Sequence, residues 1–240
     1  MIVYKKIESQ DSSFLYSFTS CHTIEEKELE GLGDMNFAGM VVYHDGIVAF
    51  ADSKATRISL MGNMFQDKEK ESITKLFFHN DYILATTGNN EIFLNKEKHY
   101  IDEYLQKKIK SNLSWQNILS KLYFTILEND YPDDYAIQFL IGNKNPHPIS
   151  YADNYQVQHF QISKNGLTRH FQTRGQYQSP PVITIGNKYY TGMTKYIQTG
   201  NSTKDFHQTL NSVERIIKEA DSLSNEYNPV GLPLTTYVFR

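Results

Sequence analysis

Two apolar runs joined by a tight-turn dipeptide constrain the fold of this chain more than any other feature. Residues 40–43 and 47–51 are both apolar, and Asp45-Gly46 stands between them. Asp-Gly between β-forming residues is typical of a hairpin turn. The same design returns over residues 75–88, around Asn80-Asp81. We therefore expect four consecutive strands, arranged as antiparallel hairpins.

Helical spacing replaces this pattern in the middle of the chain. Apolar residues recur at helical intervals over residues 100–109, and Ser114 can cap a second helix with its own apolar face. Another helix begins near Ser202, where Ser202 and Asp205 have the spacing of a capping box. Further strands are expected over residues 135–141, 155–162, 167–173, 182–185 and 234–239. Because runs of strands and runs of helices are segregated, the order predicts an α+β fold of packed layers.

Composition excludes several classes of partner. Lys and Arg number 24 against 27 Asp and Glu, a formal net charge of -3, so no global positive field attracts nucleic acid or an anionic membrane. No apolar run approaches the roughly 20 residues that cross a bilayer. The single cysteine, Cys21, excludes an intramolecular disulfide framework. We expect a soluble cytoplasmic protein that contacts neither nucleic acid nor membrane.

The second strand of the first hairpin carries a more specific motif. It runs from Asp45-Gly46 through an apolar strand into Asp52-Ser-Lys-Ala-Thr56, and Ala85-Thr-Thr-Gly88 and Ile183-Thr-Ile-Gly186 follow later in the chain. This series resembles proteasome subunits and the related bacterial peptidase subunits. The resemblance covers roughly residues 36–240 and implies the four-layer αββα sandwich of N-terminal-nucleophile hydrolases, with two stacked antiparallel sheets. It implies a single domain, 1–240, in which residues 1–35 are an N-terminal extension and 36–240 the core.

The resemblance also implies a set of site residues. Active members use an N-terminal threonine whose own amino group is the base. By motif, the family's aspartate corresponds to Asp52, its lysine to Lys75, and the basic position just after the aspartate to Lys54. A positive charge at the lysine position favours deprotonation of the nucleophile. Gly88 corresponds to a glycine whose amide helps to bind the substrate oxyanion.

The nucleophile position does not fit this chemistry. The family's threonine corresponds to Asn36, and no serine, threonine or cysteine occurs over residues 24–52. An asparagine side chain has no alkoxide or thiolate with which to attack a peptide. Without a nucleophile, the simpler interpretation of Asp52 and Lys75 is a turn aspartate and a strand-start lysine that position loops.

Two functions of different classes follow. The first is a catalytically silent, proteasome subunit-like protein that acts by assembly or binding, with copies of itself or related subunits as partners. The alternative is an amide-bond hydrolase with a non-standard nucleophile, so the sequence leaves open whether the protein is an enzyme. A third view is a binder of a peptide or small ligand. We expect no cofactor and no metal, because no histidine pair has the i, i+4 spacing of a helical zinc site.

Overall fold

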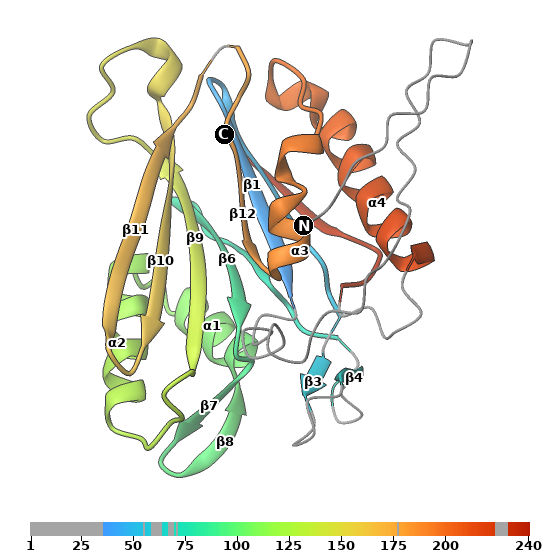
Figure 1. Cartoon of the computed structure of the whole chain (residues 1–240). Helices are drawn as coiled ribbons and strands as arrows, with labels where there is room; N and C mark the ends of the chain where they lie inside the picture. Colours follow the sequence, from blue (N-terminus) through green and yellow to red (C-terminus); the bar gives the residue numbers. More distant parts are fainter. Residues whose placement is uncertain are drawn as a thin grey trace. The chain divides into compact units, whose positions relative to one another are not determined.

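The computed structural model is an α+β fold in which two antiparallel sheets lie face to face between layers of helices (Figure 1). All the described residues belong to the unit Leu32–Arg240. They are residues 36–54, 56–58, 64–66, 70, 72–176, 178–223 and 230–240. Residues 1–35, including Cys21, lie outside them, so the single domain with an N-terminal extension stays a prediction.

Each of the two main sheets combines local hairpins with antiparallel pairs between strands distant in sequence. The four-stranded sheet has the order β12 (Val182–Gly186), β1 (Phe37–Tyr43), β2 (Gly46–Ala51) and β13 (Thr235–Phe239). The five-stranded sheet has the order β11 (Gly166–Arg174), β10 (Tyr155–Ser163), β9 (Ala136–Lys144), β6 (Tyr82–Gly88) and β5 (Leu76–Phe78). Every ladder in them is antiparallel, which confirms the two stacked antiparallel sheets of the predicted sandwich.

The first hairpin differs from its prediction in one detail. β1 pairs with β2 from Ala38 opposite Ala51 to Tyr43 opposite Gly46. The turn therefore consists of His44 and Asp45, one residue earlier than the Asp45-Gly46 dipeptide predicted. Gly46 itself begins β2.

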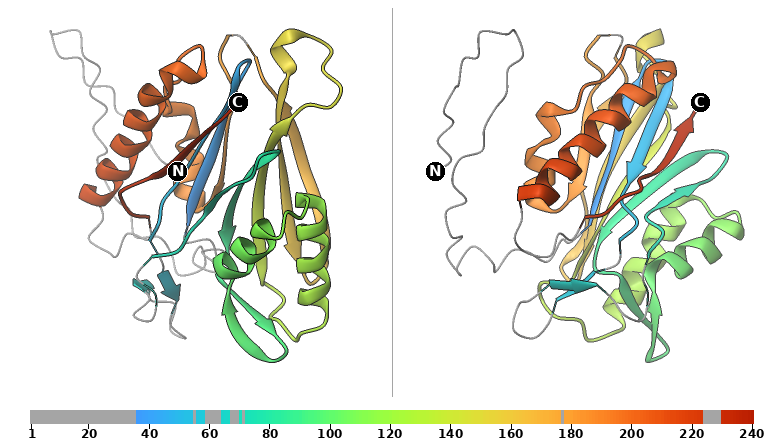
Figure 2. Two further views of the ribbon diagram at one scale, coloured as in Figure 1. Left: turned by 180° about the vertical axis from the view of Figure 1, so that it is seen from behind. Right: turned by 90° about the vertical axis from the view of Figure 1, so that its right-hand side faces the viewer.

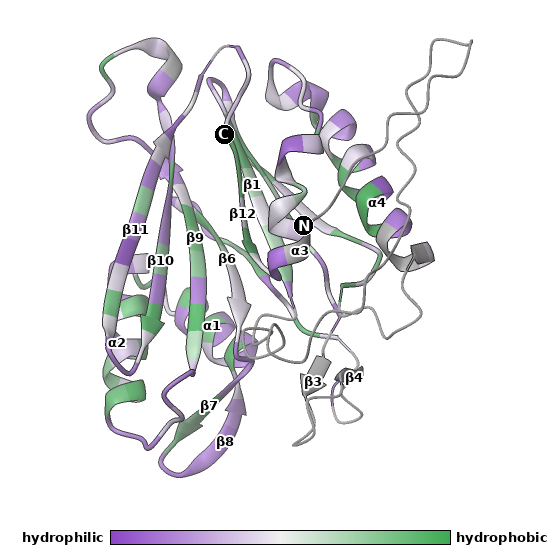
Figure 3. Cartoon of the chain, in the orientation of Figure 1, coloured by the Kyte–Doolittle hydropathy of each residue, from purple (hydrophilic) through white to green (hydrophobic). Residues whose placement is uncertain are grey.

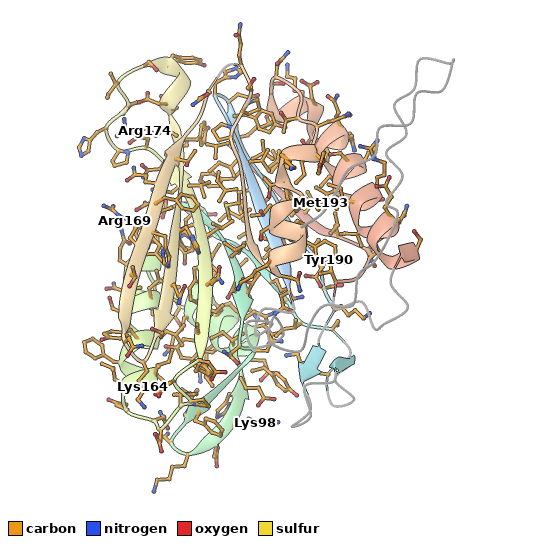
Figure 4. All side chains as sticks on the ribbon, in the orientation of Figure 1. Lys98, Lys164, Arg169, Arg174, Tyr190 and Met193 are labelled. Carbon is orange, nitrogen blue, oxygen red and sulfur yellow. The ribbon has the colours of Figure 1, made fainter. Side chains whose placement is uncertain are left out.

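Helices cover the outer face of each sheet. α1 (Ile101–Lys110) and α2 (Trp115–Leu127) pack on the five-stranded sheet, whereas α3 (Lys188–Gly192) and α4 (Phe206–Leu223) pack on the four-stranded sheet. Figure 2 shows the two helical layers on opposite sides of the sheets. Three apolar clusters separate the four layers, one under each helical layer and one between the sheets. Tyr190 and Met193, labelled in Figure 4, belong to the cluster beneath α4.

The helix caps follow the predicted chemistry. The Ser114 side chain accepts a hydrogen bond from the amide of Asn117 at the start of α2. Ser202 and Asp205 form a reciprocal capping box around a 3₁₀ turn, Thr203–Asp205, which leads into α4. The cap was therefore predicted correctly, although the first turn after it is 3₁₀ rather than α.

Two small hairpins were not predicted. β3 (Thr56–Ile58) pairs with β4 (Met64–Gln66), and β7 (Glu91–Leu94) pairs with β8 (Glu97–Tyr100). β4 ends at Gln66, and part of the segment that follows it lies outside the described residues. Within the described part of the chain, no helix combines the length and the apolar character needed to span a membrane.

Candidate functional site

Asp52 and Lys75 form a buried ion pair that joins the two sheets. Asp52 follows β2 of the four-stranded sheet, and Lys75 precedes β5 of the five-stranded sheet. The Lys75 Nζ atom lies 2.8 Å from each oxygen of the Asp52 carboxylate. The Lys75 and Asp52 side chains are only 1% and 0% exposed. The two residues that the resemblance assigned to one site are therefore in contact, and they come from facing sheets.

The surroundings of this pair satisfy every hydrogen of the ammonium group. Besides the two carboxylate oxygens, Lys75 Nζ donates to the Lys54 carbonyl oxygen at 2.8 Å. An ammonium group has three donors, so none is left over. The Asp52 carboxylate also accepts from the backbone N–H groups of Phe37, at 2.8 Å, and Lys54, at 3.2 Å. The pair is therefore closed to further partners.

Burial and mutual contact act on the titration of this pair in opposite directions. Burial raises the pKa of the Asp52 carboxyl and lowers the pKa of the Lys75 ammonium, because each charge loses its hydration. Each group opposes the shift of the other through its charge and its hydrogen bonds. The nearby Lys54 charge lowers the pKa of Lys75 further. Each charge is consequently tolerated at this depth only while the other is present.

Asn36 occupies the position directly before β1 and is 1% exposed. Its Nδ2 atom donates to the Gly88 carbonyl oxygen at 3.2 Å and to Asn90 Oδ1 at 3.1 Å. Two acceptors at one end of the amide determine its orientation, because a flipped amide would face them with an oxygen. Among the described residues, Asn36 Oδ1 has no hydrogen-bond partner. Asn36 is therefore a buried neutral side chain that links the start of β1 to the end of β6 through a hydrogen bond.

Gly88 and Lys54 contribute their backbones to this region. Gly88 has φ +97°, and a Cβ atom there would lie 2.5 Å from the carbonyl oxygen of Ala136. The glycine is required by its conformation and by this close approach. Lys54 contributes its N–H to Asp52 and its carbonyl to Lys75, while its side-chain carbons lie beside Gly231. Asp52, Lys54 and Lys75 are thus in direct contact, and Asn36 is in contact with Gly88. The two groups are linked through Phe37, which follows Asn36 and donates its N–H to Asp52.

Two buried hydroxyls close to Gly88 were not considered from the sequence. Thr86 and Thr87 are 3% and 2% exposed, and neither Oγ1 atom has a hydrogen-bond partner among the described residues. An activated hydroxyl nucleophile needs a base within hydrogen-bond distance, and the part of the chain that the structure describes places no such base beside either threonine. These residues could have been noticed as polar side chains in a strand that is otherwise apolar.

The described residues also lack an obvious metal centre. No group of three or more histidine, cysteine, aspartate or glutamate side chains among them is arranged to hold a metal ion. Asn36, Asp52, Lys54, Lys75 and Gly88 together provide one closed ion pair, two backbone segments and a neutral amide.

Comparison with known proteins does not assign the chain to a family. No protein-family model and no curated protein matches it. The interpretation of the chain as a divergent proteasome subunit-like family member, made chiefly from the segment Asp45–Thr56 with weaker matches later in the chain, is therefore wrong as a family assignment. That segment contains part of a hairpin and the aspartate that pairs with Lys75, and both have structural roles.

Solved structures match the chain at low sequence identity. Anbu (ancestral beta-subunit) from Yersinia bercovieri matches with 16% sequence identity and a TM-score of 0.46, over 85% of this chain and 80% of that chain. A Gly-1 mutant of Anbu from Hyphomicrobium sp. strain MC1 matches with 14% identity and a TM-score of 0.45, over 85% and 81%. What defines this chain is its own architecture, an α+β sandwich with a closed ion pair between the sheets.

Proposed function

We propose that this protein is a catalytically silent αββα-sandwich protein that acts through contacts with other protein chains. The observation that carries the proposal is the closed state of Lys75, whose three donors all bind Asp52 and the Lys54 carbonyl. A lysine in this state has no donor left for a nucleophile or an oxyanion. Its role is to hold the two sheets together at the ends of β2 and β5.

The surroundings of Asn36 support the same interpretation. Acyl transfer needs an activated nucleophile and hydrogen-bond donors aimed at the developing oxyanion. Asn36 supplies a neutral amide whose nitrogen is bound to the Gly88 carbonyl oxygen. That carbonyl is an acceptor and would repel an oxyanion. Residue 36 therefore supplies neither a nucleophile nor a free side-chain donor for an oxyanion.

The loop between β9 and β10 provides a surface suited to protein contacts. Ile149 is 87% exposed and Tyr151 is 72% exposed, which is high for large hydrophobic side chains. Asp153 holds this loop by accepting from the amides of Ile149, at 3.0 Å, and Ser150, at 2.7 Å. Asn145 Nδ2 also donates to the Asp153 carbonyl oxygen at 2.8 Å. A loop that is ordered before binding loses little conformational entropy when a partner covers it.

We propose further copies of this chain, or related subunits, as the partners of this loop. Light scattering of the full chain over a range of concentrations tests the assembly, with the double variant Ile149→Ser/Tyr151→Ser as the disrupting change. Leu167→Ser is the matched control, because Leu167 is 37% exposed and lies at the start of β11, away from the loop. We expect a smaller mass for the double variant alone. A monomer at every concentration in all three proteins would refute the assembly.

Hydrolysis is tested separately with a panel of fluorogenic peptides. We expect no turnover above that of buffer. Turnover that is blocked by a covalent threonine-directed inhibitor would favour the alternative, an amide-bond hydrolase with a nucleophile other than residue 36.

A further inference from the structure

A groove opens on the outer helical layer, away from the ion pair between the sheets. It has a volume of about 650 Å³ and is lined by α1, α2 and the β7–β8 hairpin. The hairpin extends beyond the two helices, and Lys98 marks its β8 strand in Figure 4. Neither Asp52 nor Lys75 lines the groove. A ligand bound in this groove would therefore not contact the ion pair.

Aromatic and aliphatic side chains line much of this groove. Phe124 of α2 is 61% exposed and Phe93 of β7 is 38% exposed. Leu94 and Tyr104 also line it, and both pack against the apolar cluster beneath α1 and α2. Figure 3 shows the contrast between hydrophobic β7 and hydrophilic β8 within the hairpin. Two exposed phenylalanine rings that share one groove are candidate anchors for a large apolar side chain.

Three lysines stand among these apolar residues. Lys107 and Lys108 come from α1 and Lys121 from α2. None of the three has a carboxylate within ion-pair distance among the described residues, although Lys108 Nζ lies 5.1 Å from the centre of the Tyr104 ring. Three unpaired ammonium groups beside an apolar surface favour an anionic ligand.

Two glutamates also line the groove, and one of them is already engaged. Glu103 Oε1 lies 3.3 Å from Lys70 Nζ, and Lys70 also binds Asp102 at 2.6 Å. Glu128, at the end of α2, is the remaining carboxylate. The lysines therefore outnumber the acidic groups, and the local charge is positive on a chain whose net charge is -3. His99 faces Glu97 at 4.0 Å and adds positive charge only when protonated.

We infer that this groove binds an acidic peptide segment of a partner protein. A large apolar side chain of the segment packs against Phe93 and Phe124, and its carboxylates face Lys107, Lys108 and Lys121. A peptide fits better than a nucleic acid, because the lysines of the groove exceed its glutamates by only one. A nucleic acid has a charge at every phosphate, whereas a peptide can combine a few carboxylates with a large apolar side chain. The inference goes beyond the proposed function, since it concerns a different surface and holds whether or not the sandwich is silent.

Fluorescence anisotropy of the full chain with a labelled peptide of alternating glutamate and phenylalanine tests this inference. The matched peptide has lysine in place of every glutamate. We expect saturable binding of the acidic peptide, at least about tenfold tighter than that of the basic peptide, with affinity falling as salt rises. A basic peptide that binds as tightly, or an acidic peptide that does not bind at millimolar concentration, would overturn the inference.

Variants then locate the binding surface. Lys107→Glu/Lys121→Glu should weaken binding of the acidic peptide by about tenfold or more, and Phe124→Ser should weaken it by a similar factor. Lys188→Glu/Lys204→Glu is the control, because it changes the net charge equally but lies on the opposite helical layer. If both double variants lost the same affinity for the acidic peptide, the effect would be one of net charge. That result would overturn the assignment of binding to this groove. A short DNA oligonucleotide that binds more tightly than the acidic peptide would overturn the choice of a peptide.

Discussion

Lys75 and Asp52 connect the two sheets through a contact in which both carboxylate oxygens lie 2.8 Å from the same ammonium nitrogen. Each residue lies directly beside the end of a strand: β2 ends at Ala51, just before the aspartate, and β5 begins at Leu76, just after the lysine. The ends of two facing strands are therefore held together by charge, at a place where the apolar cluster between the sheets gives way to polar groups.

Removing one partner of this pair should destabilise the protein strongly. Lys75→Met leaves the Asp52 carboxylate buried without its counter-charge, and such a loss typically costs about 3–5 kcal/mol. The double variant Lys75→Met/Asp52→Asn should recover part of that loss, because no charge is then buried. Urea unfolding of the wild type, both single variants and the double variant measures the coupling. A change of less than about 1 kcal/mol in Lys75→Met would contradict the structural role of the pair.

Gly88 should not tolerate a side chain. Gly88→Ala places a Cβ atom 2.5 Å from the Ala136 carbonyl oxygen at φ +97°, which we expect to lower the free energy of unfolding by about 1–3 kcal/mol. Gly192→Ala is the control, because a Cβ atom at that position meets nothing within 4 Å. The two melting curves should differ clearly, and an equal effect of both substitutions would rule out a special role for Gly88.

His159 should make the protein sensitive to mild acid. Burial, and to a smaller extent the charge of His170, lower the pKa of His159 to about 4 from its usual 6.5. Between pH 6.5 and 4 the unfolded chain therefore binds a proton that the folded protein does not, so stability falls as pH falls through this window. His159→Phe removes the imidazole group that takes up this proton in the unfolded chain. The free energy of unfolding of that variant should depend less on pH between these limits, and unchanged slopes would be inconsistent with the shift.

Asn36→Thr should not create a peptidase. Residue 36 remains internal in the chain, so its amine stays in a peptide bond and cannot act as the base. The variant also loses the two hydrogen bonds that Asn36 Nδ2 donates to Gly88 and Asn90, so a lower melting temperature is expected. A second variant combines Asn36→Thr with removal of all the preceding residues, so that the introduced threonine is terminal and has a free amine. Fluorogenic peptide turnover by the internal variant would contradict the requirement for that amine.

Local patterns were enough to predict most of the long elements. The apolar runs of β1 and β2, the Ser114 cap and the Ser202–Asp205 capping box all depend on neighbours close in sequence, so they can be recognised without knowledge of the tertiary structure. The β7–β8 hairpin escaped prediction because its turn places Asn95 at φ 53° and Lys96 at φ 69°. Lysine rarely adopts a positive φ, so Asn-Lys is a weak turn signal.

The connections within the site were only partly visible in the sequence. The motif suggested that Asp52 and Lys75 belong together, but nothing in it showed that Lys54 contributes a carbonyl or that Asn36 binds Gly88. Those contacts depend on how two sheets are stacked, which spacing along the chain does not encode. The groove was missed for the same reason, because α1, α2 and the β7–β8 hairpin become neighbours only after packing.

Catalytic silence is tested most directly by the intact mass of the full chain, recorded before and after incubation with a threonine-directed covalent inhibitor. We predict a single mass that corresponds to all 240 residues and does not change on incubation, because Asn36 offers no attacking atom and Lys75 has no free donor. An inhibitor adduct, or a mass that shows loss of the residues before Asn36, would contradict it.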